Sequence, residues 1–412
     1  MHSSIEPTDM VALLGVAMIM AIVLRRISLP YTVGLVVVGA ILAIARVNIG
    51  GPLSRDFIFD VILPPLLFEA AINLRWRDLR KDLGLVLTLS TLGTVIAAAF
   101  VTISMSILLG WPLPSALVFG ALIAATDPVA VIAMFKDMGM HGRLRVLVES
   151  ESLFNDAAAA ILFSLAIVYA SAGGAAEPLD LALKLGFAIV GGSAVGAASA
   201  GIALLLIGRT GDHLVEAALT TLAAYGAFFG AERLGVSGIL AAVVAGLIMG
   251  NVGILGAGDK STVSEKGREF ILGFWDFAAF LANSTIFPLI GLNVGAMSLG
   301  WPAIGPLALS VSIVLAARAL TVYPLSALFG RTRQAATLHQ QHVLWWGGLR
   351  GALALALALS LPPALAYREQ IVITTFVVAA FSIIVQGLTM PWLVRALGLA
   401  GDGEKPDGTN HE

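Results

Sequence analysis

Long apolar segments alternate with short polar ones along the whole chain. A transmembrane helix needs about 20 mainly apolar residues to cross a hydrocarbon core about 30 Å thick. The pattern therefore predicts an all-α polytopic membrane protein with about thirteen transmembrane helices. Their expected positions, in order, are 9–24, 30–45, 56–74, 83–110, 112–135, 146–171, 181–207, 213–231, 235–250, 270–297, 301–329, 340–361 and 370–394.

The lysines and arginines between these segments are unevenly distributed. Cytoplasmic loops of membrane proteins carry an excess of Lys and Arg. Alternate loops hold 17 and 5 of these residues, which predicts an N-terminus outside and a C-terminus in the cytoplasm. The richer set is Arg25, Arg26, Arg75, Arg77, Arg80, Lys81, Lys136, Arg143, Arg145, Arg209, Lys260, Lys266, Arg268, Arg331, Arg333, Arg395 and Lys405, and the poorer set is Arg46, Arg55, Lys184, Arg233 and Arg368.

The composition supports a membrane protein. Hydrophobic residues make up 58% of the 412 residues and charged residues 12%, and the mean hydropathy is +0.94, whereas soluble proteins carry about 25% charged residues. The chain has no cysteine, which excludes disulfides, thiol chemistry and cysteine metal sites. The first segment is expected to be retained in the membrane, because a cleaved signal peptide has basic residues before its apolar stretch and here the arginines follow it.

Two of the predicted spans carry residues that interrupt a helix. In the fifth span, Pro128 has no N–H for the carbonyl of Ala124, and its ring disfavours helix at Asp127. In the twelfth, Gly347-Gly348-Leu349-Arg350-Gly351 combines glycines with a charge, and the alternative reading is close helix packing through these glycines. The two spans cross the membrane in opposite directions. Interrupted helices in corresponding, inverted positions indicate the binding site of a secondary transporter.

The polar stretch Glu151-Ser152-Leu153-Phe154-Asn155-Asp156 lies within the sixth apolar segment. On a helix, Ser152 and Asp156 share one face, and Glu151 and Asn155 share the next. One face is suited to holding a cation and the other to locking the helix against a neighbour. A lone Ser or Asn in a membrane more often joins helices together, but carboxylates within a span indicate function by default.

Six charged residues are expected within the membrane, namely Glu69, Asp127, Glu151, Asp156, Arg318 and Arg350. If unpaired, they would cost on the order of 15–20 kcal/mol on an insertion scale. Four carboxylates against two arginines, which do not deprotonate, leave an excess of negative charge. That excess suits a bound monovalent cation that exchanges for a proton. Residue counts place Asp127 and Asp156 near mid-membrane and Glu69 nearer the cytoplasm.

These residues together resemble the monovalent cation:proton antiporter-1 family, the NhaP and NHE type of sodium/proton exchanger. The resemblance covers essentially the whole chain. A lone Asp-Pro would be a weak signal, whereas the ordered set of motifs is specific. The motifs are Phe68-Glu69, Thr126-Asp127-Pro128, Glu151-Ser152-Leu153-Phe154-Asn155-Asp156, Phe280-Leu281-Ala282-Asn283-Ser284 with Gly291-Leu292, Arg318, and Gly347-Gly348-Leu349-Arg350-Gly351.

The resemblance implies a role for the residues of an ion and proton site. Asp156 would bind a cation or a proton in turn, Thr126 and Ser152 would add oxygen ligands to a sodium ion at Asp156, and Asp127 would shape the site. Glu69 would contribute from the cytoplasmic side. Asn155, which stands where other relatives have a second Asp, is the mark of the electroneutral branch.

The resemblance also implies two structural arginines. Glu151 would form a structural ion pair with Arg318, although residue counts place Arg318 deeper in the membrane, so that the pair requires a tilted helix and an extended arginine. Arg350 would support the crossing of the fifth and twelfth spans. Ser150, where relatives more often have Gly, is a departure with little expected consequence.

The expected function is secondary active antiport of sodium or lithium against protons, in a 1:1 electroneutral exchange by alternating access, serving pH homeostasis. A potassium/proton antiporter of the same fold stays open as an alternative, because oxygen ligands alone do not separate the two ions. A cation channel is less favoured because no filter-like loop is repeated, and an intramembrane protease because His-Glu-x-x-His is absent. No cofactor and no nucleic-acid partner is expected. Gly258–Thr262 lacks the Gly-Lys pair of a phosphate loop, so no nucleotide is expected either.

The resemblance further implies an NhaA/NhaP-like fold in the cell membrane and a homodimer. Residues 1–397 would form one transmembrane domain. Within it we expect a first inverted repeat at 9–171, a linker span at 181–207 and a second inverted repeat at 213–394. A short cytoplasmic tail, 398–412, would follow.

Overall fold

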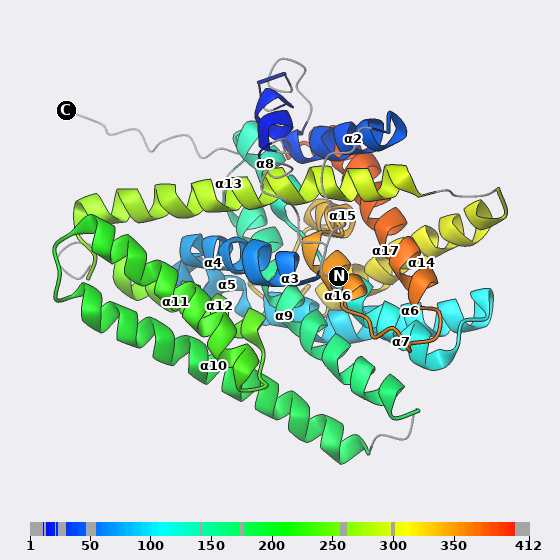
Figure 1. Cartoon of the computed structure of the whole chain (residues 1–412), viewed down its shortest axis with the longest axis horizontal. Helices are drawn as coiled ribbons and strands as arrows, with labels where there is room; N and C mark the ends of the chain where they lie inside the picture. The colour runs from blue at the N-terminus through cyan, green and yellow to red at the C-terminus, as the bar shows by residue number, and fades with distance from the viewer. Residues whose placement is uncertain are drawn as a thin grey trace.

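The computed structural model describes residues 11, 14–20, 22–23, 30–46, 55–140, 142–173, 177–255, 262–297 and 301–399, and all regular structure in these ranges is helical (Figure 1). Parts of the first expected span and of the loop at 250–269 lie outside the described residues. So do both chain termini and the predicted tail from residue 400 onward.

Within the described ranges, short connections join many of the helices, and four π-helical turns (η) lie within longer helices. The first half of the chain contains α2 (Tyr31–Ile44), α3 (Arg55–Phe57), η1 (Ile58–Ile62), α4 (Leu63–Asn73), α5 (Trp76–Leu87), η2 (Thr88–Leu92), α6 (Gly93–Leu109), α7 (Leu113–Ile123), α8 (Val129–Asp137), α9 (Arg143–Ser171) and α10 (Pro178–Ile207). The second half contains α11 (His213–Arg233), α12 (Gly238–Ile248), η3 (Met249–Ile254), α13 (Glu265–Ala296), α14 (Trp301–Leu328), α15 (Leu338–Trp346), α16 (Ala352–Leu359), α17 (Arg368–Phe381), η5 (Ser382–Gln386) and α18 (Gly387–Ala396).

Seven helices within the described residues are long and apolar enough to cross a membrane, and the all-helical membrane class is confirmed. The number of thirteen spans stays a prediction. Several helices extend beyond the predicted bounds at their charged ends, because hydropathy falls where a helix leaves the membrane although its backbone bonds continue. The seven are Trp76–Leu109, Arg143–Ser171, Leu179–Ile207, His213–Arg233, Glu265–Ala296, Pro302–Leu328 and Arg368–Ala396.

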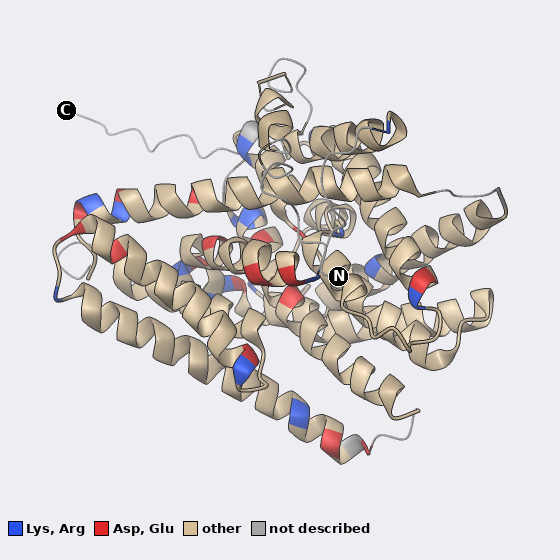
Figure 2. Ribbon diagram, in the orientation of Figure 1, with Lys and Arg blue, Asp and Glu red and all other residues tan. Residues whose placement is uncertain are grey.

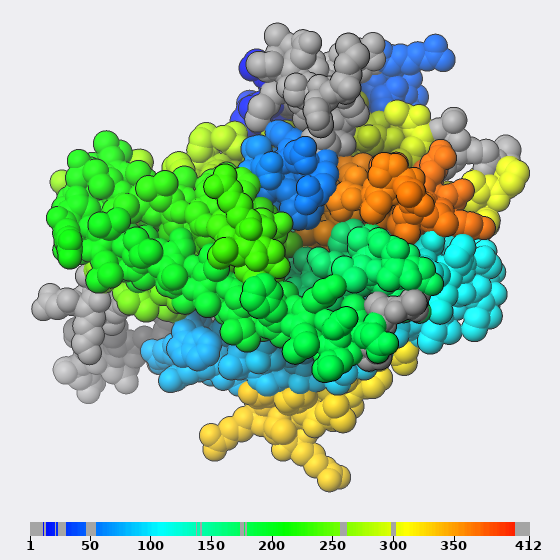
Figure 3. Space-filling model, turned by 60° about the horizontal axis from the view of Figure 1, so that its bottom comes forward, coloured from blue at the N-terminus to red at the C-terminus, as the bar shows by residue number. Residues whose placement is uncertain are grey.

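The buried side chains form two clusters. The larger one is built mainly from α5 to α9 and α14 to α18, and the smaller one from α10 to α13. Helix α4 belongs to both, because Leu63 and Leu67 face the first cluster while Phe68 packs its ring 4.5 Å from that of Trp275 in the second. The long helices α10 and α11 form one flank of the molecule (Figures 1 and 3).

Charged residues are scarce along the helices, and long stretches of α10 and α13 carry none (Figure 2). On α10, large apolar side chains such as Leu183, Phe187 and Leu205 are exposed. Exposed apolar side chains that are gathered on one helix are expected where a protein faces lipid or another subunit. The few charges that lie inside the molecule therefore mark its functional centre.

Candidate functional site

Two helices are interrupted at the same place in the molecule. Between α7 and α8 the backbone of residues 124–128 is non-helical, and between α15 and α16 that of residues 347–351 is non-helical. The two unwound segments are joined by a hydrogen bond from the Asp127 N–H to the Leu349 carbonyl, 2.8 Å long. The glycines of the second segment therefore interrupt a helix, and the alternative reading as a helix-packing motif was wrong.

Arg350 donates hydrogen bonds to the free carbonyl groups that follow the end of α7. Its side chain donates from Nη1 to the carbonyls of Ala124 and Ala125 at 3.0 and 2.8 Å, and its backbone N–H donates to Ser382 Oγ at 2.9 Å. Arg350 is buried. The last carbonyls of a helix have no partner within it and carry partial negative charge, so a cation at this position is stabilising.

Asp127 lies at the N-termini of α8 and α16, the helices that follow the two unwound segments. Its Oδ1 accepts the N–H of Val129 at 2.9 Å at the start of α8, and its carboxylate also accepts from the backbone of Ala352 at the start of α16. A carboxylate is stabilised at a helix N-terminus by the free N–H groups and the helix dipole. Gly351 is required beside it, because a Cβ on residue 351 would collide with the Asp127 side chain.

Asp156, on α9, faces the crossing. Together with Glu69, Thr126 and Asp127 it lines a cavity of about 60 Å³, which we call the site cavity, whose other walls are mainly leucine and alanine. Asp156 is half-buried and lies within electrostatic range of Asp127 and Arg350. The cavity thus combines carboxylate and hydroxyl oxygens, which are ligands suited to hard monovalent cations.

Ser152 and Asn155, both on α9, position Thr126 through hydrogen bonds. The Thr126 hydroxyl donates to Ser152 Oγ at 3.2 Å, and the Thr126 N–H donates to Asn155 Oδ1 at 3.1 Å. The Asn155 amide in turn donates to Thr94 Oγ1 at 3.1 Å. Of these three predicted site residues, only Thr126 is among the residues that line the site cavity. Thr94 was missed because a lone hydroxyl in an apolar run gives no sequence signal.

Glu69, on α4, connects the site cavity to a second and larger one. This second cavity, which we call the inner funnel, measures about 750 Å³ and is lined by Arg75, Lys136 and Arg145 among others. Glu69, Ala70, Pro128 and Val129 line both cavities. The Glu69 carboxylate accepts a hydrogen bond from Asn73 Nδ2 at 2.9 Å.

Two carboxylates near Glu69 were not among the predicted site residues. Glu149 and Asp276 line the inner funnel and interact electrostatically with Glu69. Each falls inside an expected span, at 146–171 and 270–297, but was not counted among the six charged residues expected within the membrane. Listing every charge inside the apolar segments would have found both.

Glu151 and Arg318 form a two-pronged ion pair. Arg318 donates from Nη1 and Nη2 to the two carboxylate oxygens of Glu151, both at 2.8 Å, and from Nε and Nη2 to the Leu344 carbonyl at 3.3 and 3.1 Å. Both side chains are buried. The contact joins α9 to α14 and to the end of α15, next to the interrupted segment.

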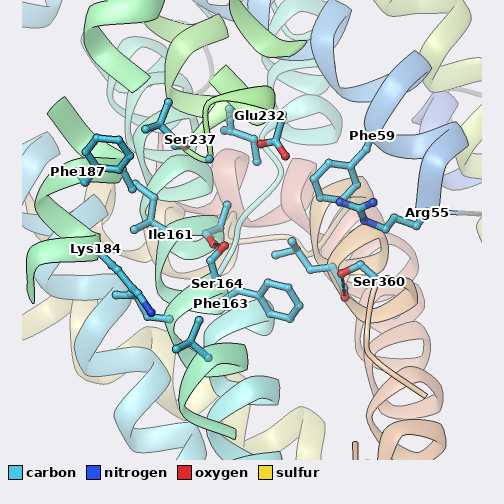
Figure 4. A pocket seen from close by; sticks show the side chains of 18 residues that line it. Arg55, Phe59, Ile161, Phe163, Ser164, Lys184, Phe187, Glu232, Ser237 and Ser360 are labelled. Carbon is cyan, nitrogen blue, oxygen red and sulfur yellow. Dashed lines mark hydrogen bonds between the residues drawn. The ribbon is translucent and has the colours of Figure 1, made fainter. Parts of the chain in front are cut away.

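A third cavity, of about 420 Å³, lies on the opposite side of the site cavity from the inner funnel's charged mouth, and we call it the outer cavity. Its wall includes Arg55, Lys184 and Glu232 together with aromatic side chains such as Phe59, Phe163 and Phe187 (Figure 4). Arg55 and Lys184 belong to the arginine-poor set of loops, whereas the inner funnel is lined from the rich set.

The sequence matches one family model over most of its length. The model, described as sodium/hydrogen exchanger, transmembrane, matches residues 13–396. Among similar proteins, the Na(+)/H(+) antiporter ApNhaP of Aphanothece halophytica is 39% identical over 393 residues, which are 94% of this chain and 74% of that protein. The Na(+)/H(+) antiporter NhaH of Halobacillus aidingensis is 33% identical over 403 residues, covering 94% of this chain and 97% of that protein.

A solved structure shares the fold. The sodium proton antiporter MjNhaP1 from Methanocaldococcus jannaschii, determined at pH 8, superposes with a TM-score of 0.74 at 21% identity. The match covers 95% of this chain and 97% of that one. The expected NhaP-like architecture is thereby confirmed.

Proposed function

The chain belongs to the sodium/hydrogen exchanger family of transmembrane transporters, which are not enzymes, and we propose that it exchanges sodium or lithium for protons at the site cavity. The observation that carries this proposal is the pair Asp127 and Asp156 in one cavity at the crossing of two interrupted helices. The relatives named as Na(+)/H(+) antiporters favour sodium over the potassium alternative.

Exchange follows from competition for one carboxylate. Ionised Asp156 binds a sodium ion, with the oxygen of Thr126 as a further ligand in the cavity wall, and protonated Asp156 does not. Ser152 acts through its hydrogen bond to Thr126. Glu69 lies where the cavity meets the inner funnel and receives the cation there.

The 1:1 stoichiometry follows from the neighbours of Asp156. Asn155 cannot ionise, and both ends of its amide are used in hydrogen bonds. The Asp127 carboxylate accepts hydrogen bonds from the N-termini of α8 and α16 and serves to stabilise them. One carboxylate is therefore left to alternate between a cation and a proton, so that no net charge is moved.

Alternating access is supported by the unequal cavities. The site cavity shares four lining residues with the inner funnel and none with the outer cavity. This arrangement corresponds to a state open toward the inner funnel. The inverted repeats at 9–171 and 213–394, with 181–207 as linker, each contain one interrupted helix, as expected for a transporter that moves one unit against another.

The orientation and assembly are also proposals. The positive-inside rule makes the inner funnel cytoplasmic, with the N-terminus outside and the C-terminus inside, in the cell membrane. The exposed apolar flank of α10 supports a homodimer. Its test is the mass of the detergent-solubilised protein after correction for bound detergent.

The proposed exchange is tested by cation-driven proton uptake into proteoliposomes. An outward sodium, lithium or potassium gradient is formed by dilution, and the internal pH is followed with a trapped dye. Sodium and lithium gradients are expected to drive proton uptake and potassium gradients to give little. A response to potassium alone would replace the proposal by potassium/proton antiport.

A further inference from the structure

A link of two residues, Leu74 and Arg75, carries the chain from α4 to α5. Helix α4 contributes Phe68 to the smaller buried cluster, whereas α5 contributes Leu79 to the larger one, so the chain passes between the two clusters here. Both link residues have extended backbone, with ψ angles of 110° and 122°, and the Arg75 side chain forms no capping hydrogen bond to α5. The Leu74 carbonyl and the Trp76 N–H therefore need partners from elsewhere in the molecule.

Asn251, on η3, supplies both partners. Its Oδ1 accepts the Trp76 N–H at 2.6 Å, and its Nδ2 donates to the Leu74 carbonyl at 2.9 Å. The same Nδ2 also donates to the Leu247 carbonyl, one turn earlier in its own helix, at 2.9 Å. An asparagine amide carries an acceptor and two donors on one planar group. A single side chain, 175 residues from Trp76 in sequence, thus caps α5 and binds the end of α4.

Helix α12 and the turn η3 are in close backbone contact with α4, and α4 and α12 lie side by side in Figure 1. A Cβ on Gly246 would lie 2.6 Å from that of Ala71, and a Cβ on Gly250 would collide with the Ile72 carbonyl. Glycine permits this approach, which fixes η3 against α4. Of the bonds that the Asn251 amide makes, the one to the end of α4 lies within this packed pair. The one to the start of α5 crosses out of it.

The link also forms part of the wall of the inner funnel. Asn73, the last residue of α4, lines the funnel together with Leu74 and Arg75. The Asn73 amide donates to the Glu69 carboxylate at 2.9 Å and to the Glu69 carbonyl at 3.0 Å. Glu69 lines both the inner funnel and the site cavity. A displacement of the link therefore changes the funnel wall next to the site cavity.

We propose that Asn251 is a positioning residue that stabilises the state open toward the inner funnel, an inference that rests on the proposed function. Alternating access moves one unit against another, and the two buried clusters are the units that the packing defines. Such a movement carries the start of α5 away from η3, so that the Trp76 N–H loses its acceptor. The bond therefore opposes closure of the funnel. Its removal shifts the population toward the state open on the other side.

The role of Asn251 is tested by the KM for sodium on each side of the membrane, measured in vesicles of both orientations. Each KM is inversely proportional to the fraction of the state that binds from that side. In Asn251→Ala, the ratio of the KM on the funnel side to the KM on the opposite side is expected to rise roughly fivefold, since losing a cap changes an equilibrium by about threefold to thirtyfold. Asn251→Asp, which keeps an acceptor for the Trp76 N–H, should keep the ratio.

The matched control is Asn293→Ala, because the Asn293 amide donates to the Leu289 carbonyl of its own helix. A general loss of stability lowers the exchange rate but leaves the ratio of the two KM values unchanged. An unchanged ratio in Asn251→Ala would overturn the role, as would an equal rise in Asn293→Ala. A rise in Asn251→Asp as large as that in Asn251→Ala would show that the bond to Trp76 is not the one that matters.

Thiol labelling reports the same equilibrium independently of the transported ion, since the chain has no cysteine. Ala133, partly exposed on α8, lines the inner funnel. An impermeant methanethiosulfonate, applied from the funnel side, is expected to modify Ala133→Cys more slowly when Asn251→Ala is added and at an unchanged rate when Asn293→Ala is added. Equal rates in all three proteins would overturn the role of Asn251 even with sodium exchange confirmed. Slower labelling without sodium-driven flux would instead overturn the proposed function alone.

Discussion

Arg318 and Glu151, 167 residues apart in sequence, meet through two parallel hydrogen bonds of 2.8 Å in the buried interior. The same guanidinium also donates to the Leu344 carbonyl, so a single side chain connects α9, α14 and α15. This connection lies beside the crossing without lining the site cavity. It fixes the position of the helix that carries Asp156.

Removing this arginine is expected to destabilise the protein. Arg318→Ala leaves Glu151 as a buried charge without its partner, which costs about 3–5 kcal/mol. The measurement is thermal unfolding in detergent. Arg145→Ala is the control, because its ion pair with Glu149 is longer, at 3.8 Å, and partly exposed, so that its loss is worth at most about 1 kcal/mol. Equal melting temperatures for Arg318→Ala and the unmodified protein would contradict a structural role for the ion pair.

Gly351 has no room for a side chain, and Gly351→Ala is expected to lose most exchange. The added methyl would displace the Asp127 carboxylate from the N-termini of α8 and α16. The control is Gly186→Ala at an exposed position of α10, where a Cβ meets no atom within 4 Å and where alanine favours the helix by about 0.5–1 kcal/mol. The measurement is sodium-driven proton flux at matched protein insertion. Normal flux in Gly351→Ala would contradict the geometry of the crossing.

The sequence predicted which charged residues the fold brings together, because these residues stand out against an apolar background. Asp127, Asp156, Glu151, Arg318 and Arg350 all lie at one crossing, as their placement inside apolar segments indicated. What could not be predicted is which atoms face the cavity. The helical periodicity places Ser152 on the face of Asp156, but Ser152 bonds to Thr126 because the unwound segment runs directly against it.

The helical membrane fold was also predictable from the contrast between apolar and polar residues, but its details were not. The length of the apolar segments predicts the helices. Pro128 and the glycines near Arg350 predict the two positions at which a helix is interrupted. The π-helical turn at Ile58–Ile62 was not predicted, since it depends on packing between helices and leaves no periodic signal. The outer cavity depends on tertiary packing in the same way.

Apparent sodium affinity is expected to fall with pH. Protons and sodium compete for the Asp156 carboxylate, and the protonated form binds no cation. Below the pKa of the site, the KM for sodium should therefore rise about tenfold per pH unit, with an unchanged maximal rate at saturating sodium. Initial rates of proton flux at several pH values test this. A KM that is independent of pH would mean that the proton and the cation bind at different groups.

The exchange is expected to be insensitive to membrane potential. One sodium ion against one proton moves no net charge, whereas one uncompensated charge would be worth about 2.3 kcal/mol per 100 mV. A potential set with potassium and valinomycin should leave the reversal point of sodium-driven proton flux unchanged, provided that potassium is not transported. A reversal point that follows the potential would require a second proton, carried by Asp127 or Glu69.

Sodium-driven proton flux through Asp156→Asn, in proteoliposomes with matched insertion and melting temperature, tests the central claim most directly. A neutral amide cannot alternate between a proton and a cation, so the account predicts no flux from this variant. Asp180→Asn, which removes an exposed carboxylate from α10, should exchange like the unmodified protein. Substantial flux through Asp156→Asn would contradict the assignment of Asp156 as the exchanging group.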